Sequence, residues 1–353
     1  MLACHAVPAT ISESPLLQLT LMRFRMFFRE PSAVFWSFGF PIVLSFVLGL
    51  AFRSRPAEPV YAAVEQGEGA AALAKALAAR PEVHIELLDA AAARAALRSG
   101  KVALVIVPGP PRTYRFDPAR PDSRLARLAV DDLLQRADGR KDPTPIAEAL
   151  FNEPGGRYID FLIPGLIGMN IMSSGLWGVG YVIVDLRTRK LLKRIVATPM
   201  RRWHFLVSFI LLRMAFLVVE LPLLLGFARF VFDVTVQGPL LLVALLGALG
   251  SFVFAGIGIL VASRTENTQT VGGLINLVSL PMFMGSGVFF SNARFPDVMQ
   301  PVVRALPLTT LINALRAVMN EGAGFSQTAL PMAILALWGI VTTLVALYRF
   351  RWQ

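Results

Sequence analysis

Two ionisable residues stand within an otherwise apolar run of the sequence. Glu220 lies near the middle of residues 205–231, and Arg213 precedes it by seven residues. An ionisable side chain inside a membrane segment is costly and is a candidate functional group. Seven residues are two helical turns, so the two side chains share one helix face and can form an ion pair. Three alternatives stay open: a structural ion pair or interhelical hydrogen bond, a role of Glu220 in substrate or proton movement, and extension of Arg213 to the interface.

The sequence carries no pattern that indicates catalysis. The phosphate-binding pattern GxxxxGK[ST] does not occur. The three histidines, His5, His84 and His204, have no metal-ligand spacing. The single cysteine, Cys4, excludes an internal disulfide and a cysteine-based metal cluster. We therefore expect no catalytic residue, metal site or cofactor in this chain.

A dense group of basic residues follows an apolar run. Residues 161–184 contain no charged side chain, and a run of about twenty apolar residues can cross a bilayer. A short basic loop directly after such a run marks the cytoplasmic face. We therefore expect residues 185–204 to form a structured cytosolic segment that a partner could bind. Its bases, set against the single acid Asp185, are Arg187, Arg189, Lys190, Lys193, Arg194, Arg201 and Arg202.

The composition predicts a membrane protein. Of 353 residues, 55% are hydrophobic and 16% are charged, and the mean hydropathy is +0.61. A soluble domain carries about a quarter charged residues. Much of the net charge of +11 lies in short loops beside apolar runs. Membrane orientation explains such basic loops, so no nucleic-acid partner is expected.

Apolar runs predict an α-helical polytopic membrane protein with six transmembrane helices. Residues 295–319 are too interrupted by proline for a span and too apolar for an ordinary loop, so a re-entrant hairpin is expected there. Six spans place both termini on one side, and the basic loops assign that side to the cytosol. The expected spans are 33–52, 161–184, 205–231, 239–262, 271–290 and 331–347.

Residues 1–32 are expected to hold a cytosolic tail and an amphipathic helix. Arg23, Arg25 and Arg29 interrupt an apolar pattern between Pro15 and Pro31. This pattern is typical of a helix that lies in the membrane interface with its arginines toward anionic headgroups. The alternative is a cytosolic helix packed on the basic loop.

Residues 53–156 differ in character from the rest of the chain. Charges of both signs are mixed, and the apolar patterns alternate between those of strands and helices, as strand, helix, strand, helix, strand. We expect an inserted α/β domain of about a hundred residues between the first and second spans. The predicted topology places it outside the cytoplasm.

Five segments, in this order and topology, resemble one protein family. The chain is similar over nearly its whole length to the membrane subunit of ABC-2 type exporters, in the drug-export branch with a large extracytoplasmic insert. The segments are REPSAVFWSFGFPIVLSFVLGLAF (29–52), FLIPGLIGMNIM (161–172), RKLLKRIVATPMRRWHFL (189–206), LPMFMGSGVFF (280–290) and LPLTTLINALR (306–316).

The resemblance implies a permease without its own ATPase site. The permease would pair with a second copy of itself or with a homologue. The pair would bind two cytosolic ABC ATPase subunits that hold ATP–Mg. The interfacial helix, at 16–28, and a coupling helix at about 185–200 would seat on the ATPase, and Pro199 would end the coupling helix. The implied ATPase-coupling residues are Arg187, Arg189, Lys190, Lys193, Arg194, Thr198 and Pro199.

The resemblance also implies a translocation path along the permease–permease interface, lined by the second and fifth spans. Interhelical hydrogen bonding is the alternative for its polar members. The cargo would be a hydrophobic or amphipathic drug, lipid or glycolipid-like molecule moved outward through the inner membrane. Membrane lipid and a periplasmic adaptor are further candidate partners. The candidate path residues are Asn170, Ser173, Ser174, Glu220, Asn276 and Met282.

Two other classes of protein remain open. An ion-coupled secondary transporter needs charges within its spans, and Glu220 and Arg213 are the main candidates. A membrane-anchored sensor or assembly factor would use residues 53–156 as its working part. Co-purification with a separate ATPase distinguishes the exporter from both.

Overall fold

The computed structural model describes residues 15–51, 60–80, 82–141, 144, 155–196 and 202–351. The chain divides into two compact units, which we describe separately. One comprises residues 1–53 with 152–353, and the other comprises residues 54–151. Thr198, Pro199 and residues 1–14 lie outside the described residues, so the predicted end of the coupling helix is not tested.

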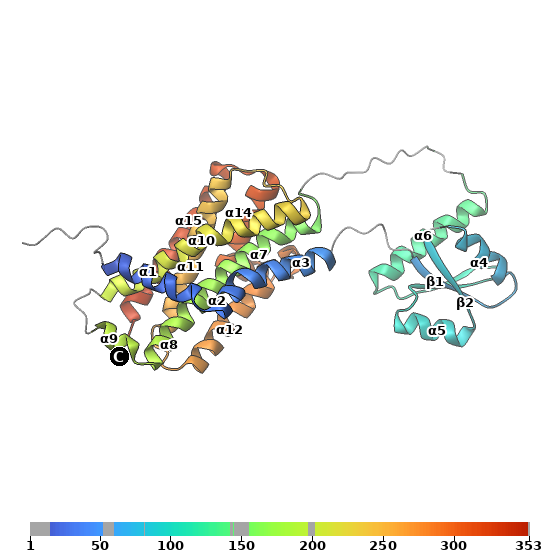
Figure 1. Cartoon of the computed structure of the whole chain (residues 1–353). Helices are drawn as coiled ribbons and strands as arrows, with labels where there is room; N and C mark the ends of the chain where they lie inside the picture. The colour runs from blue at the N-terminus through green and yellow to red at the C-terminus, as the bar shows by residue number, and fades with distance from the viewer. Residues whose placement is uncertain are drawn as a thin grey trace, which may run out of the picture. The chain divides into compact units, whose positions relative to one another are not determined.

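The larger unit is helical (Figure 1). Its first part holds α1 (Pro15–Phe28), α2 (Pro31–Val34), the π-helical η2 (Phe35–Gly39) and α3 (Phe40–Ala51). Its central part holds α7 (Tyr158–Gly175), the π-helical η3 (Leu176–Tyr181), α8 (Val182–Thr188), α9 (Leu191–Val196), α10 (Arg202–Phe232) and α11 (Leu240–Ala262). Its last part holds α12 (Thr268–Gly285), the 3₁₀ turn η4 (Asn292–Arg294), α13 (Gln300–Ala305), α14 (Pro307–Glu321) and α15 (Phe325–Arg349).

Four helices in the described residues are long and apolar enough to cross a membrane. They are Tyr158–Thr188, Trp203–Phe232, Leu240–Ala262 and Phe325–Arg349. They match four of the six predicted spans. The other two predicted spans correspond to the shorter apolar helix Phe35–Ala51 and to α12. A polytopic helical protein is therefore supported, while the count of six crossings remains a prediction.

Proline accounts for the widened turn in the first apolar helix. Pro41 has no N–H to donate to the carbonyl of Ser37, so the regular α-helical bond is missing there. The preceding turn adopts π-helical bonding, in which the Phe40 N–H donates to the Phe35 carbonyl. The Ser45 hydroxyl donates to the Pro41 carbonyl at 2.7 Å. The chain remains helical across the proline.

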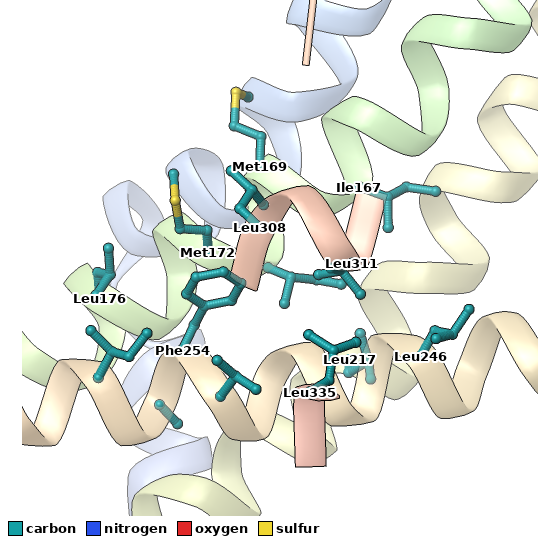
Figure 2. Packing of buried hydrophobic residues seen from close by; sticks show 14 of the residues in the cluster. Ile167, Met169, Met172, Leu176, Leu217, Leu246, Phe254, Leu308, Leu311 and Leu335 are labelled. Atoms are coloured by element: carbon teal, nitrogen blue, oxygen red, sulfur yellow. The ribbon is translucent and has the colours of Figure 1, made fainter. Parts of the chain in front are cut away.

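Helix α11 lies at the centre of the packing and contacts α7, α10, α14 and α15. Its small residues allow neighbouring helices to approach closely. A Cβ atom on Gly258 would lie 2.5 Å from the Gly175 carbonyl oxygen. Figure 2 shows the apolar side chains beside this crossing, with Phe254 of α11 near Met172 and Leu176 of the α7–η3 segment.

Residues 295–319, predicted as a re-entrant hairpin, form two helices joined at Leu306. Pro307 occupies the first turn of α14, where its missing N–H is tolerated. The side chains of Leu311 and Leu315 are fully buried against the core. Helix α14 contacts α7, α11 and α15. The helical break is therefore present, and re-entry from the membrane surface remains a prediction.

Residues 60–137 contain a four-stranded sheet with helices on both faces. The strand order is β2-β1-β3-β4; β1 pairs in parallel with β2 and β3, and β4 is antiparallel to β3. Val64 and Ile106 face a core with α4 and α6, while Ala63 and Val105 face Ala93 of α5. The elements are β1 (Val60–Glu65), α4 (Ala70–Ala78), β2 (Val83–Leu88), α5 (Ala90–Ser99), β3 (Leu104–Val107), β4 (Thr113–Arg115) and α6 (Pro121–Ala137).

Candidate functional site

A buried polar cluster joins α7 and α10. The Arg213 Nη1 atom lies 2.5 Å from Glu220 Oε2, and each side chain is 4% exposed. Asn170 of α7, also buried, donates through Nδ2 to Glu220 Oε1. The predicted ion pair is therefore present, and one predicted path residue is bonded to another. Because the two partners of Glu220 come from different helices, the carboxylate links α7 to α10.

The Arg213 guanidinium retains unused hydrogen-bonding capacity. Its Nε and Nη2 atoms are buried and have no hydrogen-bond partner among the described residues. Buried donors without acceptors are unfavourable. The cluster can therefore accept an oxygen atom of a water or a polar group of a passing molecule, in addition to holding the two helices together. Both the structural and the translocation interpretations of Glu220 remain compatible with this geometry.

The other candidate path residues occupy different environments. Ser173 and Ser174 are half-buried on α7. On α12, Asn276 is exposed and Met282 is buried. Helix α12 contacts α7 and η3. The structure thus places these residues on two neighbouring helices, and it brings only Asn170 and Glu220 into a described hydrogen bond.

The predicted single coupling helix at 185–200 is wrong, because α8 ends at Thr188 and α9 begins at Leu191. Lys190 has φ of 59°, a left-handed conformation that interrupts a helix. Its N–H donates to the Arg187 carbonyl at 2.9 Å. Leu192 is buried, while Lys193 and Arg194 are exposed. The turn therefore redirects the chain and leaves two bases open to solvent or a partner.

Arg187 and Arg189, two residues apart, have opposite orientations. Arg187 points inward and donates to the carbonyl oxygens of Ala262 and Arg351, at 2.7 and 2.8 Å. Arg189 is exposed and pairs with Asp185 at 2.9 Å. Arg187 is half-buried, and its two terminal nitrogens already donate to carbonyls within the chain. Its predicted contact with an ATPase stays a prediction.

The arginines of α1 also differ from the prediction. Arg25 and Arg29 are exposed, as the headgroup-facing hypothesis requires. Arg23 is buried, and its guanidinium carbon lies 3.5 Å from the ring centroid of Phe209 on α10. A cation over an aromatic face is stabilised by the ring quadrupole. The prediction that all three arginines face headgroups is therefore wrong for Arg23, because α1 packs on α10.

Sequence reasoning missed a polar network at the other end of α7. Arg157 forms an ion pair of 2.9 Å with buried Asp160. It also donates to the carbonyls of Phe232 and Asp233, at 3.0 and 3.1 Å. Asn320 of α14 donates to the Asp160 carbonyl at 2.9 Å. The start of α7 is thus tied to the end of α10 and to α14.

Arg316 of α14 belongs to the same network. Its Nη2 atom donates to Phe161 O at 3.1 Å and to Gly287 O at 2.5 Å, and its guanidinium lies 3.5 Å from the Phe161 ring centroid. A sequence signal was available. Arg316 follows Ile312 by one helical turn on the buried face of α14, where a cation requires acceptors.

The architecture defines a polytopic helical membrane protein with buried polar links between helices. The chain belongs to the ABC-2 family transporter proteins, whose family model matches residues 31–348.

Relatives of known name are ABC transporters or transport permeases. The chain is 25% identical over 204 residues to ABC transporter G family member 20 of Dictyostelium discoideum, covering 57% of this chain and 28% of that protein. It is 31% identical over 123 residues to the inner membrane transport permease YhhJ of Escherichia coli (strain K12), covering 34% and 32%. It is 33% identical over 118 residues to the daunorubicin resistance ABC transporter permease protein DrrB1 of Streptomyces coeruleorubidus, covering 33% and 40%. The alignments thus span less than half the length of each of these relatives.

Proposed function

We propose that this chain is the membrane-spanning permease subunit of an ABC exporter, powered by a separate cytosolic ATPase. The observation that carries the proposal is the family match over residues 31–348. Of the four described helices long enough to cross a membrane, it covers three completely and the fourth, α15, up to residue 348. ATP–Mg would bind to the partner subunit. The chain would supply the path and the surface on which the ATPase acts.

The exposed bases around α9 support an ATPase-binding role. Arg189, Lys193 and Arg194 are exposed on one short segment between α8 and α10. Charged surfaces of this kind steer and orient partners of opposite charge. In the proposed mechanism, closure of the ATPase pair displaces this segment and rocks the spans against one another.

We further propose that two permease subunits, identical or homologous, form the translocation path between them. Asn276 is an exposed amide between apolar neighbours, Ile275 and Leu277, in the middle of helix α12. A polar side chain on the lipid-facing side of a span is unfavourable unless another helix supplies hydrogen bonds. The half-buried Ser173 and Ser174 on neighbouring α7 would extend the same path.

The proposed cargo is hydrophobic or amphipathic and moves outward. The permease DrrB1 is named for daunorubicin resistance, which supports drug-like cargo for this chain. The basic short loops support a cytosolic location for residues 185–204 and for both ends of the sequence shown, with residues 53–156 on the outer side. A periplasmic adaptor would then bind residues 53–156.

The test is purification of the tagged chain from its own cells in mild detergent, followed by mass spectrometry and an ATPase assay. We expect a stoichiometric partner that carries a phosphate-binding loop and hydrolyses ATP in a vanadate-sensitive manner. A chain that purifies without an ATPase would contradict the proposal and favour a sensor or an ion-coupled transporter.

A further inference from the structure

Arg187 connects three segments that are far apart in the sequence. From the end of α8, its Nη1 atom donates to Ala262 O at 2.7 Å and to Thr265 O. Its Nη2 atom donates to Arg351 O at 2.8 Å and to Ser263 O at 3.4 Å. Residues 262–265 comprise the last residue of α11 and the turn after it, and residue 351 follows α15, so one side chain links the ends of three helices.

The acceptors explain why an arginine occupies this position. The last carbonyl groups of a helix have no partner within the helix and carry the negative end of its dipole. A guanidinium presents several donors in a planar fork and stays charged at physiological pH. Arg187 therefore satisfies carbonyls at the end of α11 that α11 itself cannot satisfy.

The segment after α15 completes the connection. The Arg351 N–H donates to Ser263 O at 3.0 Å, the same carbonyl that accepts from Arg187. Phe350 is 7% exposed, and the Arg187 guanidinium lies 5.2 Å from its ring centroid. We refer to Arg187, Phe350, Arg351 and the carbonyls of 262–265 as the Arg187 clamp.

We propose that Arg187 is a positioning residue, which makes α8 move as one body with the adjoining ends of α11 and α15. This inference rests on the proposed function, because it assigns a route for the displacement that the ATPase causes. The exposed bases Lys193 and Arg194 would receive the force, and the Arg187 clamp would pass it to the helices. Without the clamp, the displacement would bend the left-handed turn at Lys190 and the end of α8 and would not reach the other helices.

The contrast with Arg189 provides a matched control. Both residues are arginines at the end of α8, but Arg189 is exposed and bonds only Asp185 among its described partners. Replacing Arg189 removes a base from the surface and leaves the clamp intact. Replacing Arg187 removes the clamp and leaves the exposed bases intact.

The first experiment measures ATP-driven movement without requiring a known cargo. Asn276→Cys, at an exposed position of α12, is introduced in a Cys4→Ser background. The purified complex with its ATPase is labelled with a maleimide in the presence and absence of ATP and vanadate. We expect Arg187→Ala to lose the nucleotide-dependent difference in labelling rate while the ATPase stays bound and active. Arg189→Ala should retain the difference, and Arg187→Lys should restore part of it.

An Arg187→Ala complex that responds to nucleotide as the unsubstituted chain does would overturn the inference and leave the proposed function intact. Absence of a bound ATPase from the unsubstituted chain would instead remove the proposed function. The two failures are therefore distinguishable.

The second experiment keeps Arg187 and so does not depend on the folding of an Arg187 variant. Thr188→Cys and Arg351→Cys, both at exposed positions, are combined in the Cys4→Ser background and linked with a short bismaleimide. If α8 and the segment after α15 move as one body, the cross-linking rate is unchanged by ATP and vanadate. A several-fold change in that rate would show independent movement and overturn the inference.

Discussion

Arg213 and Glu220 lie seven residues apart on α10 and form a buried ion pair of 2.5 Å, while Asn170 of α7 binds the second carboxylate oxygen. The carboxylate thus satisfies one charge on its own helix and one amide on a neighbouring helix. The cluster contains both forms of the structural interpretation of Glu220, an ion pair and an interhelical hydrogen bond.

Loss of the carboxylate charge should destabilise the protein. Glu220→Gln leaves the Arg213 cation buried without its counter-charge, and breaking a buried pair in this way costs about 3–5 kcal/mol. We expect a lower thermal unfolding temperature in detergent, with Glu266→Gln at an exposed position as the control. The double variant Arg213→Gln with Glu220→Gln should lose less than the sum of the single losses.

Transport by the Glu220→Gln variant then tests the translocation interpretation. If its stability matches that of the unsubstituted chain and transport of a fluorescent probe such as daunorubicin is lost, the ion pair is not the main role of Glu220. If the Glu220→Gln variant is less stable and its transport falls only as much as the amount of folded protein falls, the structural role of Glu220 is supported.

Charge reversal at the exposed bases should weaken ATPase binding or coupling. Lys193→Glu with Arg194→Glu places two acids where the proposed partner meets bases, which is repulsive at an interface. The measurement is the amount of ATPase that co-purifies and its rate of ATP hydrolysis. The control is Arg98→Glu with Lys101→Glu, exposed bases at the end of α5 and just after it. Equal ATPase binding and coupled transport by both double variants would remove this segment from the coupling surface.

Overpacking at the α11 crossing should be poorly tolerated. In Gly258→Ala the new Cβ atom would meet the Gly175 carbonyl oxygen at 2.5 Å, and backbone atoms of two helices must separate to admit it. Inserting a methyl group into a well-packed core costs about 1–3 kcal/mol. Gly273→Ala on α12 meets no atom within 4 Å and serves as the control. Thermal unfolding should separate the two variants, and equal unfolding temperatures would contradict the close packing.

Removal of Arg316 should loosen the connection between α14 and α7. Arg316→Ala leaves the carbonyls of Phe161 and Gly287 without this donor, and hydrogen bonds to charged groups contribute about 1.5–3 kcal/mol each. We expect a lower unfolding temperature than for Arg304→Ala, an exposed arginine on α13. Hydrogen exchange at the start of α7 should increase in Arg316→Ala alone. Unchanged exchange there would show that Arg316 does not hold this end of α7.

The apolar helices were largely predictable from the sequence. Four predicted spans match helices long enough to cross a membrane, and the close approach at α11 follows from its small residues. Helix α12 ends at Gly285, and Gly287 has φ of 78°, a conformation that favours glycine. Such features depend on local composition and backbone preference, which each segment carries by itself.

The directions of individual arginines were not predictable in the same way. Arg23 and Arg187 were both predicted to be surface bases. In the structure, Arg23 packs on an aromatic ring of α10, and Arg187 donates to carbonyls at the end of α11 and just after α15. The ion pair of Arg213 and Glu220 was predictable because both partners share one helix face.

The sequence by itself therefore determined the apolar helices, their breaks, the basic segment and the family to which the chain belongs. The tertiary structure decided which charged side chains turn inward and which remain open to a partner. The physical reason lies in the acceptors. Backbone carbonyls occur at every residue and carry no side-chain signature, so only the folded packing shows which of them an arginine such as Arg187 can reach.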